Sequence, residues 1–117
     1  MTRSVLIVDD HPSFRASARR VLEDAGYDVV GEAHDGASAL TAARRLRPAI
    51  VLVDIRLPDL DGFEIARRLT RDDHPPAVVL TSSHDPDDFT GMIARSGARG
   101  FLPKAELSGP ALAAVLK

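Results

Sequence analysis

The sequence has no cysteine, which excludes a disulfide framework and thiol chemistry. It also lacks a long apolar run: no stretch approaches the length of a membrane span, and the apolar run near the start is too short for a signal peptide. The net charge of −2 over 117 residues leaves no electrostatic footprint for nucleic acid. We therefore expect residues 1–117 to form one cytoplasmic globular domain with its own core and no membrane contact.

Short apolar runs alternate with stretches of helical periodicity along the whole chain. We predict strands at 5–8, 27–33, 49–55, 77–82 and 100–104. Amphipathic stretches lie between them, the fourth beginning near Asp85 and Pro86 and the fifth covering 109–116 behind Ser108. This alternation predicts an α/β fold with a parallel five-stranded sheet. At this length it fits a flavodoxin-like (βα)5 three-layer sandwich with strand order 2-1-3-4-5.

Acidic residues follow the two strands that this order makes neighbours. Asp9 and Asp10 end the first apolar run, and Asp54 ends the third. Ligands bind outside the carboxyl ends of such strands, so the three carboxylates are expected in one pocket. Clustered carboxylates repel one another and suit a hard cation, Mg²⁺ or Mn²⁺. A carboxylate beside such an ion also acts as a nucleophile toward phosphorus.

Two further polar side chains are expected at the same edge of the sheet. Ser82 ends the fourth apolar run and offers a hydroxyl. Lys104 ends the fifth and offers a point charge; the positive charge otherwise comes almost entirely from arginine, since the only other lysine is Lys117. Together they would neutralise the equatorial oxygens of a phosphoryl group in transfer.

Four short motifs together resemble the receiver domain of two-component response regulators, along the whole length of the chain. They are VDD in the first strand, the D-x-x-x-P-x-x-D-G run from Asp54 to Gly62, a hydroxyl after the fourth apolar run, and GARGFLPK around Lys104. The resemblance implies a phosphorylation switch that catalyses its own modification but is not a free-standing enzyme. Its partner would be a sensor histidine kinase, which donates a phosphoryl group to Asp54.

The resemblance also assigns roles to the surrounding residues. It implies that Asp9, Asp10 and Asp54 hold Mg²⁺, with the backbone carbonyl of Arg56 as a further ligand. It implies that Ser82 and Lys104 contact the phosphoryl oxygens, and that Phe101 is the aromatic switch residue. The switched surface would comprise the fourth helix, fifth strand and fifth helix. A homodimer would use that surface or one made by the first and fifth helices.

Some positions depart from the commonest pattern of the family. Leu57 stands where methionine is frequent, and Ala105 follows Lys104 where many members have proline. With GARGF, the latter resembles the subfamily that carries a LuxR-type helix-turn-helix output, so DNA contact is expected only through a domain outside these residues. The hydroxyl is ambiguous among consecutive Thr81, Ser82 and Ser83. Spacing to the lysine favours Ser82, and period-two alternation then turns its neighbours the other way.

Simpler interpretations remain open at this stage. Asp9 and Asp10 would also fit a helix N-terminus, and Phe101 a half-buried strand position. The histidines His11, His34, His74 and His84 show no metal-ligand spacing and are expected on the surface or in loops; His84 lies where family members tune the lifetime of the phosphorylated state. Two rival functions are a docking module that never uses phosphate and a Mg²⁺-dependent aspartyl-phosphate phosphatase. The second is disfavoured because Arg56 stands where its general acid would be.

Overall fold

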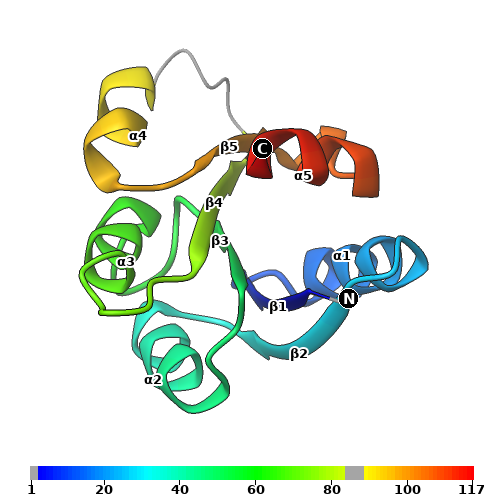
Figure 1. Ribbon diagram of the computed structural model, residues 1–117, viewed down its shortest axis with the longest axis horizontal. Helices are drawn as coiled ribbons and strands as arrows, with labels where there is room; N and C mark the ends of the chain where they lie inside the picture. The colour runs from blue at the N-terminus through cyan, green and yellow to red at the C-terminus, as the bar shows by residue number, and fades with distance from the viewer. Residues whose placement is uncertain (1–2, 84–88) are drawn as a thin grey trace.

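The computed structural model describes residues 3–83 and 89–117. Its strands form one parallel sheet in the order β2-β1-β3-β4-β5 (Figure 1). The strands are β1 (Ser4–Val8), β2 (Asp28–Ala33), β3 (Ile50–Asp54), β4 (Ala77–Ser82) and β5 (Gly100–Pro103). The helices are α1 (Pro12–Asp24), α2 (Gly36–Leu46), α3 (Gly62–Leu69), α4 (Thr90–Ser96) and α5 (Gly109–Leu116), with the 3₁₀ turn η2 (Lys104–Glu106) before α5.

This architecture confirms the predicted α/β sandwich and its strand order. The predicted strand ends differ from the observed ones by at most one residue; the fifth strand stops at Pro103 because Lys104 already belongs to η2. The last helix spans 109–116 as predicted, and the Ser108 hydroxyl accepts a hydrogen bond from the Ala111 amide at 3.1 Å. The predicted start of the fourth helix at Asp85 and Pro86 lies outside the described residues.

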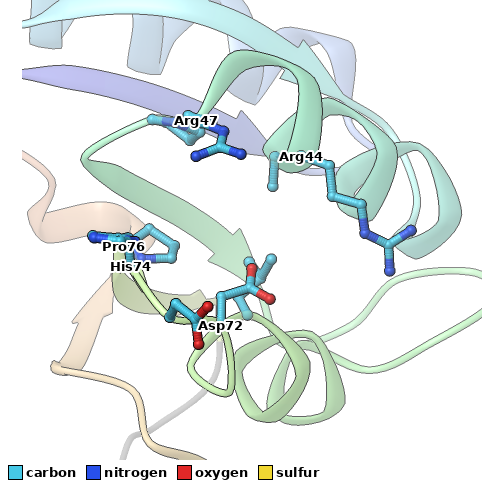
Figure 2. A pocket seen from close by; sticks show the side chains of 9 residues that line it. Arg44, Arg47, Asp72, His74 and Pro76 are labelled. Carbon is cyan, nitrogen blue, oxygen red and sulfur yellow. The ribbon is translucent and has the colours of Figure 1, made fainter.

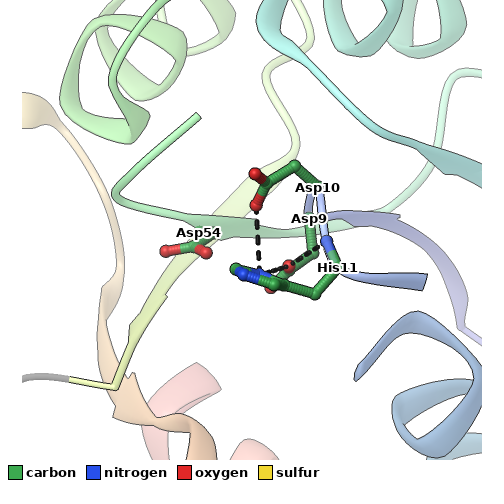
Figure 3. A group of neighbouring side chains, drawn as sticks. All are labelled: Asp9, Asp10, His11 and Asp54. Carbon is green, nitrogen blue, oxygen red and sulfur yellow. Dashed lines mark hydrogen bonds and ion pairs between the residues drawn. The ribbon is translucent and has the colours of Figure 1, made fainter. Parts of the chain in front are cut away.

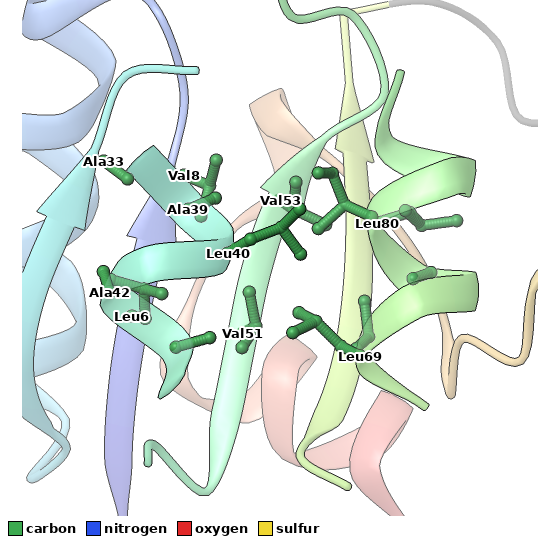
Figure 4. Packing of buried hydrophobic residues seen from close by; sticks show 14 of the residues in the cluster. Leu6, Val8, Ala33, Ala39, Leu40, Ala42, Val51, Val53, Leu69 and Leu80 are labelled. Atoms are coloured by element: carbon green, nitrogen blue, oxygen red, sulfur yellow. The ribbon is translucent and has the colours of Figure 1, made fainter. Parts of the chain in front are cut away.

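Helices cover both faces of the sheet. Figure 1 shows α2, α3 and α4 on one side of it and α1 and α5 on the other. Both β3 and β4 are buried along their whole length, as the near-continuous apolar runs predict. Figure 4 shows the larger of the two cores, which α2 and α3 form with the facing side chains of β1, β3 and β4. None of the helices in the described part of the chain has the length and apolar character that crossing a membrane requires.

Alternation along β4 decides which side each residue near its end faces. Val78 and Leu80 belong to the core under α2 and α3, whereas Val79 belongs to the core under α1 and α5. Because side chains alternate along a strand, Ser82 continues the row of Leu80 and Thr81 that of Val79. Ser82 therefore faces the same side of the sheet as Phe101, which packs against the α2/α3 core.

Candidate functional site

Charged side chains converge at the carboxyl edge of the sheet, as the sequence predicts. Val8 pairs with Val53 in the sheet register, so Asp9 and Asp54 follow neighbouring positions of β1 and β3. Lys104 reaches both of them: its Nζ is 2.7 Å from Asp9 Oδ2 and 2.9 Å from Asp54 Oδ2. Asp10 lies beside Asp9 on the more open side, and its side chain is 39% exposed (Figure 3).

Burial sets the electrostatics of this pocket. Asp54 is only 4% exposed, and burial raises the pKa of its carboxyl group. The nearby charge of Asp9 acts in the same direction, while hydrogen bonds from Lys104 and from the Arg56 amide, 3.1 Å from Asp54 Oδ1, oppose it. Lys104 is itself partly buried, which lowers its pKa, but its hydrogen bonds with Asp9 and Asp54 outweigh burial, and the net pKa is raised. Lys104 therefore stays cationic at neutral pH.

An aromatic ring of α1 packs against the ammonium group of Lys104. The Nζ of Lys104 lies 4.7 Å from the centroid of the Phe14 ring. This contact is a cation–π interaction, in which the electron-rich ring face attracts the ammonium group. It places the cation where the two carboxylates of β1 and β3 meet. Helical periodicity in the sequence does not predict this role for Phe14.

His11 is exposed in a loop, as expected, but it is also part of the acidic pocket, which the spacing of the histidines did not predict. Its Nδ1 lies 3.0 Å from Asp9 Oδ1 and 3.1 Å from Asp10 Oδ1, although its side chain is 63% exposed. Its amide donates a further hydrogen bond to Asp9 Oδ1 at 2.9 Å. The available signal was its position directly after two acids at a strand end.

The donor atoms of the pocket fit a divalent cation. One ligand atom each from Asp9, Asp10, His11 and Asp54 can be chosen so that all lie within 4.8 Å of one another. Three of the four donors are carboxylate oxygens, the ligand type that Mg²⁺ prefers. The predicted contribution of the Arg56 carbonyl stays a prediction. The backbone of Arg56 is held close to the site, because its amide donates a hydrogen bond to Asp54 and the residue forms a β-bridge with Asp61.

A glycine brings the start of α3 against the backbone of Asp54. The Gly62 amide donates to the Ile55 carbonyl at 2.7 Å. A Cβ atom on Gly62 would lie 2.6 Å from the Asp54 carbonyl oxygen and 2.8 Å from the Ile55 Cα, both of them backbone atoms. No larger residue fits without moving the chain that carries Asp54, so the last position of the D-x-x-x-P-x-x-D-G motif has a steric reason.

Two polar contacts that the sequence did not reveal fix the loops of the site. In the loop between β3 and α3, Asp59 accepts hydrogen bonds from the amides of Gly36, Ala37 and Leu60 at 2.7–3.0 Å, so this loop is tied to the start of α2. These amides, Gly36 first, lower the pKa of Asp59. Beside β1, Arg15 Nη1 donates to the Asp9 carbonyl at 2.6 Å while its Nε binds Glu32 at 3.1 Å.

The predicted switch residues lie on the side of the sheet that faces α3 and α4. Ser82 is 1% exposed, and Phe101 is half-buried. The Phe101 ring lies 6.5 Å from that of Phe89, which in turn lies 5.9 Å from that of Phe63, measured between centroids. Thr81 is equally buried on the opposite side, and its hydroxyl has no hydrogen-bond partner within residues 3–83 and 89–117. The prediction for His84 falls outside the described residues.

A second concentration of charge lies far from this pocket, at the amino edge of the sheet. A hollow of about 400 Å³ opens between the segments that lead into β3 and β4. Figure 2 shows Arg44, Arg47, Asp72 and His74 around it. None of these side chains forms an ion pair within the described part of the chain.

The arrangement of acids, lysine and buried hydroxyl matches a known family. A family profile described as the response regulator receiver domain covers residues 5–116. The chain belongs to this family. Among relatives of this receiver domain, the response regulator GacA of Pseudomonas protegens is 39% identical over 101 residues, which are 86% of this chain and 47% of that protein. The transcription regulator BvgA of Bordetella pertussis is 39% identical over 106 residues, 91% and 51% of the two chains.

Solved structures agree with the receiver fold. A two-component response regulator of the LuxR family from Aurantimonas sp. SI85-9A1 superimposes with a TM-score of 0.88 at 33% identity, covering 99% of this chain and 86% of that one. The relatives include transcriptional response regulators and LuxR-family receiver domains, as the resemblance in sequence implied. The chain spans about half the length of the curated relatives named above, 47% of GacA and 51% of BvgA.

Proposed function

We propose that this receiver domain is the phosphorylation switch of a two-component response regulator, with Asp54 as the phosphoryl acceptor. The supporting observation is the position of Lys104, whose Nζ lies 2.9 Å from Asp54 and 2.7 Å from Asp9. A carboxylate oxygen of Asp54 attacks the phosphorus of a phosphohistidine on a sensor histidine kinase. The phosphorus–nitrogen bond breaks, the imidazole leaves, and an acyl phosphate forms on Asp54.

The side chains around Asp54 stabilise the charge that accumulates during this transfer. Lys104 stays protonated and provides a fixed cation at the equatorial oxygens, and the Ser82 hydroxyl donates a hydrogen bond to the product phosphoryl group. Mg²⁺ or Mn²⁺, held by Asp9, Asp10, Asp54 and the Arg56 carbonyl, supplies further neutralisation when bound. Because burial disfavours the ionised form of Asp54, the fold keeps this nucleophile poorly solvated and reactive.

The switch follows from the side of the sheet that Ser82 and Phe101 share. A phosphoryl group on Asp54 draws the Ser82 hydroxyl toward it and vacates space beneath β4. Phe101 rotates toward that space and buries its ring, which changes the surface of α4, β5 and α5. The shift is only as large as the difference in phosphoryl binding between the two states.

The output of this switch is the control of transcription. BvgA, which is about twice the length of this chain, is a transcription regulator, and a similar solved structure belongs to the LuxR family. A LuxR-type helix-turn-helix outside these residues would make the DNA contact. The domain works in the cytoplasm, where it meets its kinase, and pairs with a second copy through α4, β5 and α5 or through α1 and α5. It transfers phosphate to and from itself and is not a free-standing enzyme.

Intact-mass spectrometry tests the acceptor directly. Wild type incubated with a small acyl phosphate or phosphoramidate in Mg²⁺ should gain one phosphoryl group, and Asp54→Asn should gain none. Chelation should abolish the gain, because the ion screens the carboxylate from the incoming anion. Equal modification of both proteins rules out Asp54. Absence of modification in wild type, with kinase or small donor, favours the docking module, whereas multiple turnover on a phosphoester favours the phosphatase.

The switch has a separate test that uses its neighbour as a control. Ser82→Ala should leave Asp54 reactive but remove phosphorylation-dependent dimerisation, measured by sedimentation on the full-length protein. Thr81→Ala should leave dimerisation intact, because Thr81 faces the α1/α5 side of the sheet. The reverse result would show that the hydroxyl that reads the phosphate is Thr81. If neither variant changes dimerisation, the signal does not pass through β4.

A further inference from the structure

The imidazole of His11 has no structural task at the start of α1. His11 is the N-cap residue, but its side chain makes no capping hydrogen bond. It turns instead into the acidic pocket, where Nδ1 lies 3.0 Å from Asp9 Oδ1 and 3.1 Å from Asp10 Oδ1 (Figure 3). The position of the imidazole is therefore set by its contacts with the two acids and not by capping of the helix.

The two distances from His11 Nδ1 are compatible with neighbouring ligands around one ion. Ligand atoms about 2.1 Å from an ion and at right angles to each other are about 3.0 Å apart. The two distances from His11 Nδ1 agree with this value. Asp9 Oδ1 is the oxygen that faces His11, because Asp9 Oδ2 already binds Lys104 at 2.7 Å. The two oxygens of Asp9 are thus divided between the lysine and the candidate ion.

We propose that His11 Nδ1 is a nitrogen ligand of this pocket and shifts its preference from Mg²⁺ toward Co²⁺, Ni²⁺ and Zn²⁺. The inference rests on the proposed function, since the ion site is the same. Mg²⁺ keeps oxygen ligands and several waters and gains little from an imidazole. The other three ions bind imidazole well, and carboxylates with imidazole form a mixed donor set that suits them.

Ligation requires a change of tautomer, which the position of His11 permits. Between two carboxylate oxygens, Nδ1 carries the hydrogen and donates it. Binding an ion moves that hydrogen to Nε2, and because the side chain is 63% exposed, Nε2–H can be solvated. An ion held by His11, Asp9 and Asp10 has fewer positions left for Asp54 and a phosphoryl group. Ions of this class should therefore compete with Mg²⁺ and slow phosphorylation.

Calorimetric titration with Mg²⁺ and with Co²⁺ tests the proposal on wild type and His11→Asn. The asparagine amide keeps a donor near the position of Nδ1 but does not ligate through nitrogen. His11→Asn should lower the affinity for Co²⁺ on the order of tenfold, while the affinity for Mg²⁺ should change by less than about threefold. His34→Asn is the matched control, because His34 is similarly exposed and also lies beside an acid, 3.5 Å from Asp35, yet outside the pocket.

A spectroscopic readout separates ligation from an indirect effect. In long-range ¹H–¹⁵N spectra, Zn²⁺ should shift Nδ1 of His11 to a metal-bound position and leave His34 unchanged. An unchanged ratio of Co²⁺ to Mg²⁺ affinity in His11→Asn, with Nδ1 unshifted, overturns the proposal while Mg²⁺-dependent phosphorylation of Asp54 stands. A His11-dependent Co²⁺ site without any phosphorylation supports the proposal and overturns the proposed function instead. Wild type that binds neither ion overturns both.

Discussion

Two regions of this domain carry a similar set of charged side chains and differ in almost everything else. At the carboxyl edge of the sheet, Lys104 lies within 2.9 Å of two buried carboxylates. At the amino edge, Arg44, Arg47 and Asp72 surround a hollow of about 400 Å³ without pairing to one another (Figure 2). The charges of the second region surround a hollow, whereas those of the first are in contact and buried, and contact and burial are what alter the chemistry of a charged group.

The difference arises from the elements that carry the charges. Asp9, Asp54 and Lys104 directly follow or end strands, so the sheet register holds them a few ångströms apart. Arg44 and Arg47 lie at the end of α2, and Asp72 in the loop after α3, where nothing forces them together. Convergence of side chains from rigid strands, and not the number of charges or the size of a hollow, therefore marks the site. Five predictions test this contrast.

The largest expected effect is a difference in stability between alanine substitutions of two glycines at opposite edges of the sheet. Gly62→Ala should lower the free energy of unfolding by about 3 kcal/mol, because its Cβ would meet backbone atoms 2.6 and 2.8 Å away. Gly26→Ala, at the end of α1, should cost only about 1 kcal/mol, since its φ of +94° is unfavourable but the space is open. Urea denaturation measures both. Similar losses would show that the start of α3 yields easily and does not hold Asp54.

Metal ions should stabilise one edge and not the other. Mg²⁺ at about 100 times its Kd should add about 2.7 kcal/mol to wild type, because it binds only the folded pocket. Asp10→Asn should raise the metal-free thermal midpoint by relieving repulsion and should blunt the response to Mg²⁺. Asp72→Asn, in the hollow, should leave that response unchanged. A wild-type midpoint indifferent to Mg²⁺ would contradict the carboxylate pocket.

Replacing a basic side chain by a neutral one should lower the free energy of unfolding only where that side chain is paired with carboxylates. Lys104→Met should lower the free energy of unfolding by about 2 kcal/mol at neutral pH, because two buried carboxylates lose their counter-charge. Mg²⁺ should restore part of this loss. Arg44→Gln should change stability by less than about 0.5 kcal/mol, as expected for an unpaired surface charge. Equal effects at the two positions would remove the distinction between the edges.

How far the sequence predicts this site depends on which interactions come from strand ends. Asp54, Asp9 and Lys104 were predicted because parallel strands bring their carboxyl ends to one edge whatever the details of packing. The preference for Ser82 agrees with the strand alternation, which is a property of the backbone. The same reasoning predicted the sheet order, since alternating apolar runs and amphipathic stretches leave few topologies.

The unpredicted contacts depend on how helices and loops pack against the sheet. Phe14 lies near Lys104 only because α1 presents one face at a particular rotation, which periodicity does not determine to within a residue. Asp59 binds amides at the start of α2, more than twenty residues away in sequence. His11 was judged by the spacing of histidines, whereas its partners are the carboxylates directly before it.

The contribution of Asp54 to stability should change with pH in the opposite direction to that of a carboxylate in a surface ion pair. Its pKa is raised from 3.8, so its contribution to stability is fully present below that value and is lost as pH rises through the folded pKa. The free energy of unfolding of Asp54→Asn should therefore rise relative to that of wild type as pH rises through this window. Glu32 has a pKa lowered from 4.5, chiefly by Arg19, so its contribution is present above 4.5 and lost on acidification. The free energy of unfolding of Glu32→Gln should fall relative to that of wild type as pH rises through 4.5. Denaturation of each variant at a series of pH values measures both changes.

The smallest expected effect lies at the hollow and has a backbone origin. Arg47 ends α2 with a φ of 46°, a left-handed conformation that costs energy for any residue with a Cβ. Arg47→Gly removes that cost but increases the freedom of the unfolded chain, so the net gain should be about 0.5 kcal/mol. Phosphorylation of Asp54 should be unaffected, because no contact of the carboxyl-edge pocket involves this residue. A clear loss of stability would show that the Arg47 side chain makes a favourable interaction at the hollow, and a loss of phosphorylation would show that the two edges are coupled.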